Sequence, residues 1–200
     1  ISIGGAQSTV VAQATSLIAD RYPGVKFQFF NGDAETLMER LDHGTLDFSI
    51  LIEPVDLVKY EHLPLNETDE WGLLMQKDCS LASKEIIRPE DIQGVPLILP
   101  QRIGLQRELS AWAGIPMEQL NTIATFDILF NNPSLLIKNG LGYAFALRTL
   151  VDTSESPTLC FRPLEPAIKI QYGLAWKRYP IFSKAAEKFI EQIRELIDDQ

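Results

Sequence analysis

The segment GGAQST, residues 4–9, groups polar atoms at a turn that precedes a helix. Two glycines free the backbone of this turn, and Ser8 and Thr9 place hydroxyl groups beside the unpaired N–H groups of the first helical turn. Such an arrangement can bind an anion or a carboxylate, and Gln7 belongs to the same candidate ligand site. The same residues also fit a plain tight turn in which Ser8 caps the helix.

A second group of candidate ligand-binding residues follows an apolar strand. Pro100, Gln101 and Arg102 stand at the carboxyl end of that strand, which is the edge where open α/β sheets bind ligands. The guanidinium group of Arg102 could pair with a carboxylate through two hydrogen bonds. A solvated arginine in a loop is the alternative interpretation.

Two helix starts supply the remaining candidate ligand-binding residues. Phe130, Asn131 and Asn132 precede a helix that begins at Pro133, and Asp33 precedes another helix. Asparagine and aspartate cap helices, because their side chains accept hydrogen bonds from the free N–H groups there. Ligand contact by Asn131 and Asn132 is the hypothesis that we keep beside capping.

Residues suited to catalysis or metal binding are sparse. The chain contains only two histidines, neither HExxH nor GxSxG occurs, and the glycine pairs match neither a Walker loop nor a dinucleotide fingerprint. Cys79 and Cys160 lack CxxC or CxxH spacing, so we expect reduced thiols. We therefore predict no catalytic residue, no metal, no cofactor and no enzymatic activity.

The elements that must position these residues alternate between helices and strands. Leu37, Met38 and Leu41 recur at helical spacing, Gly44 ends that helix, and the apolar FSILI of residues 48–52 has the pattern of a strand covered on both faces. NNPSLLIKNGLGYAFALR repeats this order, with Gly140 as the terminator. The order of elements predicts an α/β fold with a mostly parallel sheet. The predicted strands are residues 1–3, 25–30, 48–52, 71–75, 122–126, 143–147 and 168–176, and the predicted helices include residues 9–22, 34–43, 105–115 and 183–197.

The composition predicts a folded chain that does not itself bind DNA. Of the 200 residues, 46% are hydrophobic, and the net charge of -9 without any Lys/Arg-rich run repels phosphate backbones. No apolar run approaches the roughly 20 residues that cross a bilayer, so we expect no membrane partner. Because the chain opens at Ile1 without methionine or a signal-peptide pattern, we expect an excised piece of a longer protein. The two thiols, read as reduced, predict a cytoplasmic location.

Five segments resemble those of a known family, and their order along the chain is what makes the resemblance specific. They read ISIGG, PGVKFQFFNGDAETLMERLDHGTLDFSILI, DCSLASKEIIRPEDIQGVPLIL, LIKNGLGYAFAL and YGLAWKRYPIFSKAAEKFIEQI. In this order the chain resembles the effector-binding domain of a LysR-type transcriptional regulator. It departs from the common family pattern at Arg148 and Thr149, where a proline is frequent, and at Cys79 and Ser80, which replace a histidine-proline pair.

The resemblance implies an architecture for the chain. It implies two α/β subdomains of the type 2 periplasmic-binding-protein kind with a small-molecule site in the cleft between them. Residues 1–77 with 172–200 are expected to form subdomain I, and residues 78–171 subdomain II, because the closing helix needs a lobe to cover. A winged helix-turn-helix domain, absent from this chain, is expected to precede it and to bind promoter DNA.

The predicted function is that of a sensor that binds a small metabolite and signals to this DNA-binding domain. Donors at helix starts favour a small carboxylate or another anion as the effector. Two alternatives are a solute-binding protein of a transport system with the same fold and an enzyme on this fold, such as a dehydratase or transferase.

The first helix predicts a homodimer or a higher homo-oligomer. Its apolar positions outnumber those of one core-facing stripe, which leaves apolar surface for a partner. The resemblance pairs this helix with residues 105–115 of a second copy in an antiparallel two-fold arrangement. The predicted interface residues are Val10, Val11, Ala14, Leu17, Ile18, Leu109 and Trp112.

Overall fold

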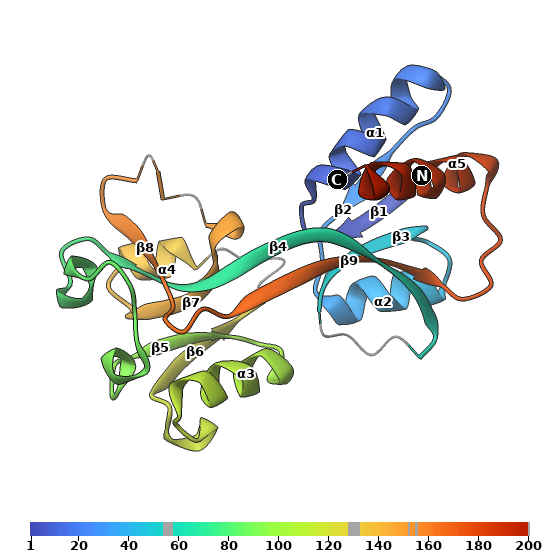
Figure 1. Ribbon diagram of the computed structural model, residues 1–200. Helices are drawn as coiled ribbons and strands as arrows, with labels where there is room; N and C mark the ends of the chain where they lie inside the picture. The colour runs from blue at the N-terminus through green and yellow to red at the C-terminus, as the bar shows by residue number, and fades with distance from the viewer. Residues whose placement is uncertain (54–57, 128–132, 152, 155, 200) are drawn as a thin grey trace. The chain divides into compact units, whose positions relative to one another are not determined.

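The computed structural model describes residues 1–53, 58–127, 133–151, 153–154 and 156–199 (Figure 1). The chain divides into two compact units. Unit 1 comprises Ile1–Thr68 and Gln171–Gln200, and unit 2 comprises Asp69–Ile170. The two boundaries fall inside two long strands, β4 (Tyr60–Gln76) and β9 (Lys169–Lys177), so each of these strands contributes residues to both units.

Unit 1 is built on a sheet whose central strands are parallel. β1 (Ser2–Gly5) lies between β2 (Gln28–Phe30) and β3 (Phe48–Ile52), and β9 (Lys169–Lys177) pairs antiparallel with β3. The chain leaves β1 for β2 on one side and then passes to β3 on the other. Because parallel crossovers are right-handed, the two connecting helices are carried to opposite faces of the sheet.

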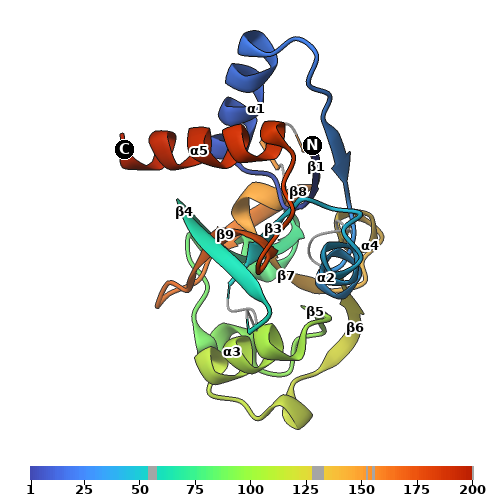
Figure 2. The same cartoon turned by 90° about the vertical axis from the view of Figure 1, so that its right-hand side faces the viewer.

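Three helices cover the sheet of unit 1. α1 (Thr9–Arg21) packs against α5 (Lys184–Asp198), and both figures show the two helices side by side (Figure 1, Figure 2). α2 (Ala34–Asp42) contacts β1 and β3. It ends at Asp42 with His43 as its C-cap and Gly44 at positive φ, as the sequence predicts.

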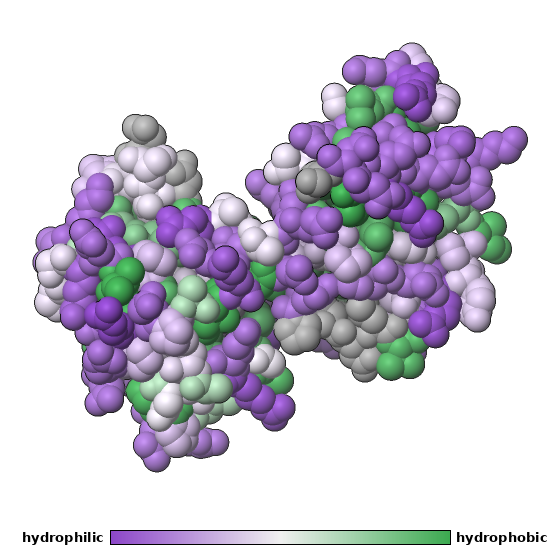
Figure 3. All heavy atoms as spheres, in the orientation of Figure 1, coloured by the Kyte–Doolittle hydropathy of each residue, from purple (hydrophilic) through white to green (hydrophobic). Residues whose placement is uncertain are grey.

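Aromatic rings fill the core beneath these helices. Every residue of β3 is buried, which confirms the strand covered on both faces. The ring of Phe48 lies 5.1 Å from that of Phe182, 5.4 Å from that of Phe189 and 6.3 Å from that of Trp176, measured between centroids. The outer face of α5 is mostly hydrophilic (Figure 3), and the apolar stripe of this helix faces the core.

The described residues of unit 2 form a mixed sheet of five strands in the order β8, β4, β7, β5, β6. β4 pairs antiparallel with both β7 (Tyr143–Leu147) and β8 (Leu159–Pro163). β5 (Leu97–Pro100) runs parallel to both β7 and β6 (Thr122–Phe126). This unit also contains the helices α3 (Ile103–Ala113) and α4 (Ser134–Lys138), and the short 3-10 turns η1 (Ser80–Ser83), η2 (Pro89–Ile92), η3 (Met117–Gln119) and η4 (Arg148–Leu150).

The structure corrects several predicted element bounds. β2 begins at Gln28 rather than at residue 25, and the strand predicted at 71–75 is the second half of the 17-residue β4. β8 was not predicted, since its five residues LCFRP end in a proline and follow Pro157 closely. Within the described residues, no helix is both long and apolar enough to cross a lipid bilayer.

Candidate functional site

The turn before α1 is shaped by the backbone of Gly5. Gly5 has φ +107°, and a Cβ atom there would overlap the carbonyl oxygen of Ile50, so only glycine fits without strain. Ser8 then caps the helix, because its Oγ accepts a hydrogen bond from the N–H of Val11 at 3.1 Å. Gln7 and Thr9 are exposed and Ser8 is half-buried. The capping interpretation therefore accounts for the Ser8 side chain.

A carboxylate of the chain itself occupies the free N–H groups of α1. The backbone N–H groups of Thr9 and Val10 donate to Glu67 Oε1 at 2.7 and 3.2 Å. The second carboxylate oxygen, Glu67 Oε2, is buried and makes no hydrogen bond to any described residue. The start of α1 thus binds a carboxylate as the sequence suggested, but that carboxylate is internal. Sequence reasoning missed Glu67, because a strand residue 58 positions away from Thr9 carries no local signal of this contact.

Asp33 caps α2 at the same edge of the sheet. Its Oδ1 accepts a hydrogen bond from the N–H of Thr36 at 2.6 Å. β1 and β2 are parallel neighbours, so the turn at residues 6–8 and Asp33 both follow carboxyl ends at one sheet edge. The three candidate residues Phe130, Asn131 and Asn132 lie outside the described residues.

The backbone around Pro100 and Gln101 is occupied by contacts within unit 2. Pro100 is buried at the end of β5, and the exposed Gln101 donates its N–H to the carbonyl oxygen of Phe126 at 2.7 Å. The side-chain amide of Gln106 donates to the Pro100 carbonyl oxygen at 2.8 Å and to that of Gln101 at 3.3 Å. Gln106, which sequence reasoning did not single out, therefore fixes the loop that carries Arg102.

Arg102 stands at the N-cap of α3 and is half-buried. Burial lowers the pKa of its guanidinium group, and the negative charge of Asp127 acts in the opposite direction. A guanidinium group remains charged at neutral pH despite such a shift. Arg102 therefore presents a partly desolvated cation at the start of a helix, where an anion is also favoured by the helix N–H groups.

Most of the predicted dimer-interface residues are buried within the chain. Val10, Val11, Ala14 and Ile18 are buried in unit 1, and Leu109 is buried in unit 2. These side chains are therefore covered by packing within the chain, and α1 itself packs against α5. Leu17 remains 42% exposed on α1, and the half-buried Trp112 donates its indole N–H to the carbonyl oxygen of Pro166 at 2.8 Å.

Within the part of the chain that the structure describes, no group of three or more histidine, cysteine, aspartate and glutamate side chains could hold a metal ion. The two cysteines are free thiols, with Cys160 buried and Cys79 half-buried. The described groups thus offer hydrogen-bond donors, one partly buried cation and an internal carboxylate. Such groups recognise a ligand through hydrogen bonds and charge.

Solved structures define the class of this fold. The C-terminal domain of a probable LysR family transcriptional regulator from Rhodococcus sp. RHA1 matches with a TM-score of 0.76 at 19% identity, over 97% of this chain and 98% of that chain. The CcmR regulatory domain of Synechocystis PCC6803, solved in complex with 2-PG, matches with a TM-score of 0.75 at 16% identity, over 100% of this chain and 96% of that chain. The fold is thus the mixed α/β fold of LysR effector-binding domains, of the type 2 periplasmic-binding-protein kind, which confirms the predicted fold class.

The family follows from the sequence profile. The family described as LysR substrate binding domain matches residues 2–198, and the chain belongs to it. The uncharacterized HTH-type transcriptional regulator YvbU of Bacillus subtilis (strain 168) is 25% identical over 180 residues, which are 88% of this chain and 59% of YvbU. The chain therefore spans about three fifths of the length of that relative. This is a family of transcription-regulator domains rather than of enzymes, and its members bind small-molecule effectors.

Proposed function

We propose that the chain senses a small anionic metabolite and transmits its binding to a DNA-binding domain elsewhere in a longer protein. Membership of the LysR substrate-binding family supports the sensor role. The HTH-type name of YvbU, of which the chain spans 59%, supports a DNA-binding partner domain. The complex of the CcmR regulatory domain with 2-PG offers a structural relative with a small bound molecule.

The observation that carries the anionic part of the proposal is the Glu67 carboxylate on the N–H groups of Thr9 and Val10. This contact supports the view that the N–H groups and the dipole at the start of α1 accept a carboxylate. An anionic effector that uses these donors must displace Glu67. The carboxylate of Glu67 would then accept hydrogen bonds from these donors while the effector is absent. Its competition would lower the affinity for the effector.

Arg102 is the second proposed anchor for the effector. Its charge is partly desolvated, which strengthens a hydrogen-bonded ion pair relative to one in open water. Gln7, Ser8, Asp33, Pro100 and Gln101 complete the proposed set among the described residues, and Asn131 and Asn132 belong to it outside them.

We further propose that the chain forms a homodimer, in which α1 contributes its exposed apolar side chains. Leu17 is 42% exposed on this helix, and Tyr22, the residue that follows its last turn, is 37% exposed. Both are large apolar side chains on or beside an element that is otherwise packed against α5. Promoter DNA is proposed to bind only through the separate DNA-binding domain, because the net charge of -9 opposes contact of this chain with phosphates.

Three variants test the proposed effector site. A thermal-shift screen of metabolites, followed by calorimetric titration of the best anionic hit, gives the reference affinity. Arg102→Ala should weaken binding by about 2 kcal/mol and Ser8→Ala by about 1 kcal/mol, the usual losses for a charge-assisted and a neutral hydrogen bond. Glu67→Gln should tighten binding by about 1 kcal/mol, because the internal competitor loses its charge.

Glu61→Gln is the matched control for Glu67→Gln. Glu61 lies on the same strand, β4, but its carboxylate pairs with Arg178 at 3.2 Å instead of reaching α1. This variant should leave the affinity unchanged. A neutral, apolar metabolite as the sole hit, unaffected by the Arg102, Ser8 and Glu67 variants, would contradict the proposal.

A further inference from the structure

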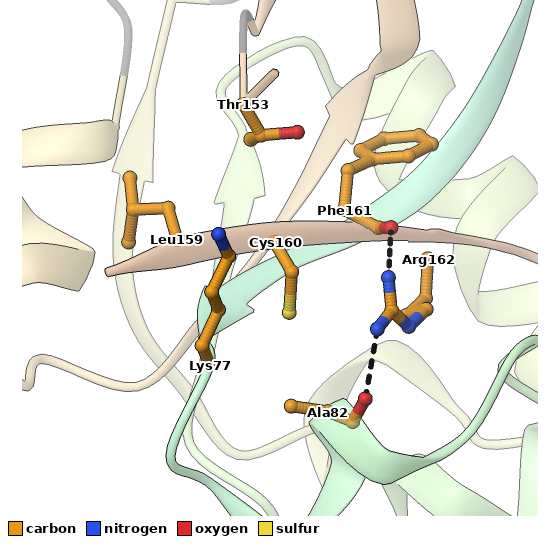
Figure 4. A pocket seen from close by; sticks show the side chains of 7 residues that line it. All are labelled: Lys77, Ala82, Thr153, Leu159, Cys160, Phe161 and Arg162. Carbon is orange, nitrogen blue, oxygen red and sulfur yellow. Dashed lines mark hydrogen bonds between the residues drawn. The ribbon is translucent and has the colours of Figure 1, made fainter. Parts of the chain in front are cut away.

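A pocket of about 390 Å³ opens in unit 2 near the end of β4 (Figure 4). Its lining includes Lys77, Ala82, Thr153, Leu159, Cys160 and Arg162. All of these residues belong to Asp69–Ile170, so the pocket is formed within one unit. Its volume falls in the range of pockets that hold small ligands.

The strand register separates this pocket from the loop at residues 100–102. β4 is antiparallel to β7, with Leu74 opposite Ala144, and β5 is parallel to β7, with Leu97 opposite Tyr143. The end of β4, where Lys77 follows, is therefore level with the start of β5. The loop at residues 100–102 follows the opposite end of β5. The pocket and the proposed Arg102 anchor thus lie at opposite edges of this sheet.

Arg162 is held at the pocket by neutral groups. Its Nε donates to the carbonyl oxygen of Lys84 at 2.6 Å, and its Nη2 and Nη1 donate to those of Ala82 and Phe161 at 2.9 and 3.2 Å (Figure 4). These three bonds orient the guanidinium group without neutralising it, and the group carries further N–H donors. The carboxylate of Asp91, near this segment, is paired with the ammonium group of Lys84 at 2.8 Å.

Lys77 is the second cation of the pocket. Its Nζ donates to the carbonyl oxygen of Ser156 at 2.6 Å, which is again a neutral acceptor. Among the described residues, neither Lys77 nor Arg162 makes an ion pair with a carboxylate. Two positive charges without a described counterion therefore line one pocket in a chain whose net charge is -9.

The floor of the pocket is apolar and uncharged. Ala82, Leu159 and Cys160 are buried, and Cys160 shares a face of β8 with Arg162 because the two are separated by one residue. In the view of Figure 4 the thiol of Cys160 lies between the side chains of Lys77 and Arg162. Burial raises the pKa of this thiol, although the charge of Arg162 acts in the opposite direction. The thiol is thus held neutral and does not supply the missing counterion.

We propose that this pocket is a second ligand site, which binds a small organic carboxylate through Lys77 and Arg162. The carboxylate would provide the counterion that the described residues lack. The short apolar part of the ligand would contact Leu159, Cys160 and Ala82. Both cations are already oriented by backbone carbonyl groups, so little side-chain freedom is lost when the ligand binds.

Protein-observed NMR on the 200-residue chain tests this site, with butyrate as the probe. Butyrate should shift the backbone amide signals of residues 159–162 with a dissociation constant of about 1 to 5 mM, as a single small anion allows. Butyramide, which has the same shape without the charge, should produce no such shifts. Inorganic phosphate, an anion without an apolar part, should bind more weakly than butyrate.

Variants assign the binding to the two cations. Lys77→Gln changes an exposed side chain and should raise the dissociation constant about tenfold, and Arg162→Gln should do the same if it folds. Arg107→Gln, a change of an exposed arginine on α3 of the same unit, is the matched control and should have no effect. Arg102→Ala should also leave these shifts unchanged, which separates this site from the proposed effector site.

Three results would overturn the proposal. The first is the absence of shifts at residues 159–162 up to about 20 mM butyrate, a concentration that detects even millimolar binding. The second is equal binding of butyrate by the Lys77→Gln variant and the unchanged chain. The third is a shift of the same amide signals by butyramide as large as that by butyrate, since the charge of the ligand would then contribute nothing to binding.

Discussion

At the residue scale, Tyr60 shows how burial and a neighbouring charge act together on one side chain. Tyr60 is only 6% exposed, and its hydroxyl donates to Asp42 Oδ1 at 2.8 Å. Burial, this hydrogen bond and the negative charge of Asp42 raise the pKa of Tyr60 from 10.0 to about 12. An ionised Tyr60 would place a second negative charge beside Asp42 in a poorly solvated position.

We expect Tyr60 to make stability fall at alkaline pH. Because the folded pKa lies above the unfolded value of 10.0, this contribution is fully present below pH 10 and is lost as the pH rises towards about 12. The loss should total about 2 to 3 kcal/mol. Urea unfolding of the unchanged chain and of Tyr60→Phe, measured between pH 8 and pH 11.5 (roughly the window where one tyrosine titrates), gives the difference.

Tyr60→Phe should cost about 1 kcal/mol at pH 8, because the hydrogen bond to Asp42 is lost. Its stability should then fall less steeply above pH 10 than that of the unchanged chain. Other tyrosines and lysines titrate in both proteins, so the difference between the two curves isolates Tyr60. Parallel curves for the two proteins would show that Tyr60 is not responsible.

At the scale of elements, β4 depends on one position without a side chain. Gly72 pairs with Ala146 of β7 on one side and with Pro163 of β8 on the other. A Cβ atom at this position would overlap Phe161 Cζ and would lie 2.5 Å from the carbonyl oxygen of Arg162. Because one obstacle is backbone of the paired strand, movement of a flexible side chain cannot relieve the clash.

We therefore expect Gly72→Ala to destabilise the chain by about 3 kcal/mol, at the upper end of the usual cost of overpacking. Gly104→Ala is the matched control, since a Cβ atom on Gly104 in α3 meets nothing within 4 Å. Alanine has a higher helix propensity than glycine, so this control should be neutral or stabilising by up to about 1 kcal/mol. Chemical denaturation of both variants measures the difference, and equal stabilities would refute the steric argument.

At the scale of the whole molecule, the proposed dimer can be tested through surface side chains alone. Sedimentation at tens of micromolar should show a dimer if its interface is worth about 8 kcal/mol. Leu17→Glu, on the exposed side of α1, should shift the population towards monomer, because a charge would be buried at the interface. Ile181→Glu changes a side chain that is 103% exposed in the segment between β9 and α5 and should have no effect. Monomer alone at this concentration, or the same shift for both variants, would count against the proposal.

The sequence by itself determined the order and type of most elements and the family of the chain. Helical spacing from Leu37 to Leu41, a glycine after the helix and a continuous apolar strand are local signals, so they survive without knowledge of the partners. The cap by Ser8 is local for the same reason, since the Oγ acceptor and the Val11 donor are three residues apart. β8 was not predicted, because its five residues end in a proline, follow another proline closely and show too little periodicity.

Only the tertiary structure decided which groups meet across the chain. The Glu67 carboxylate reaches Thr9 across 58 positions, and the Arg162 guanidinium reaches the carbonyl of Ala82 across 80 positions. No local pattern encodes these contacts, because they arise from strand pairing and helix packing. Packing within unit 1 also decided that Val10, Val11, Ala14 and Ile18 belong to the core, whereas the sequence shows only that they are apolar. Sequence periodicity can identify a buried face, but which element covers that face depends on contacts that only the folded chain makes.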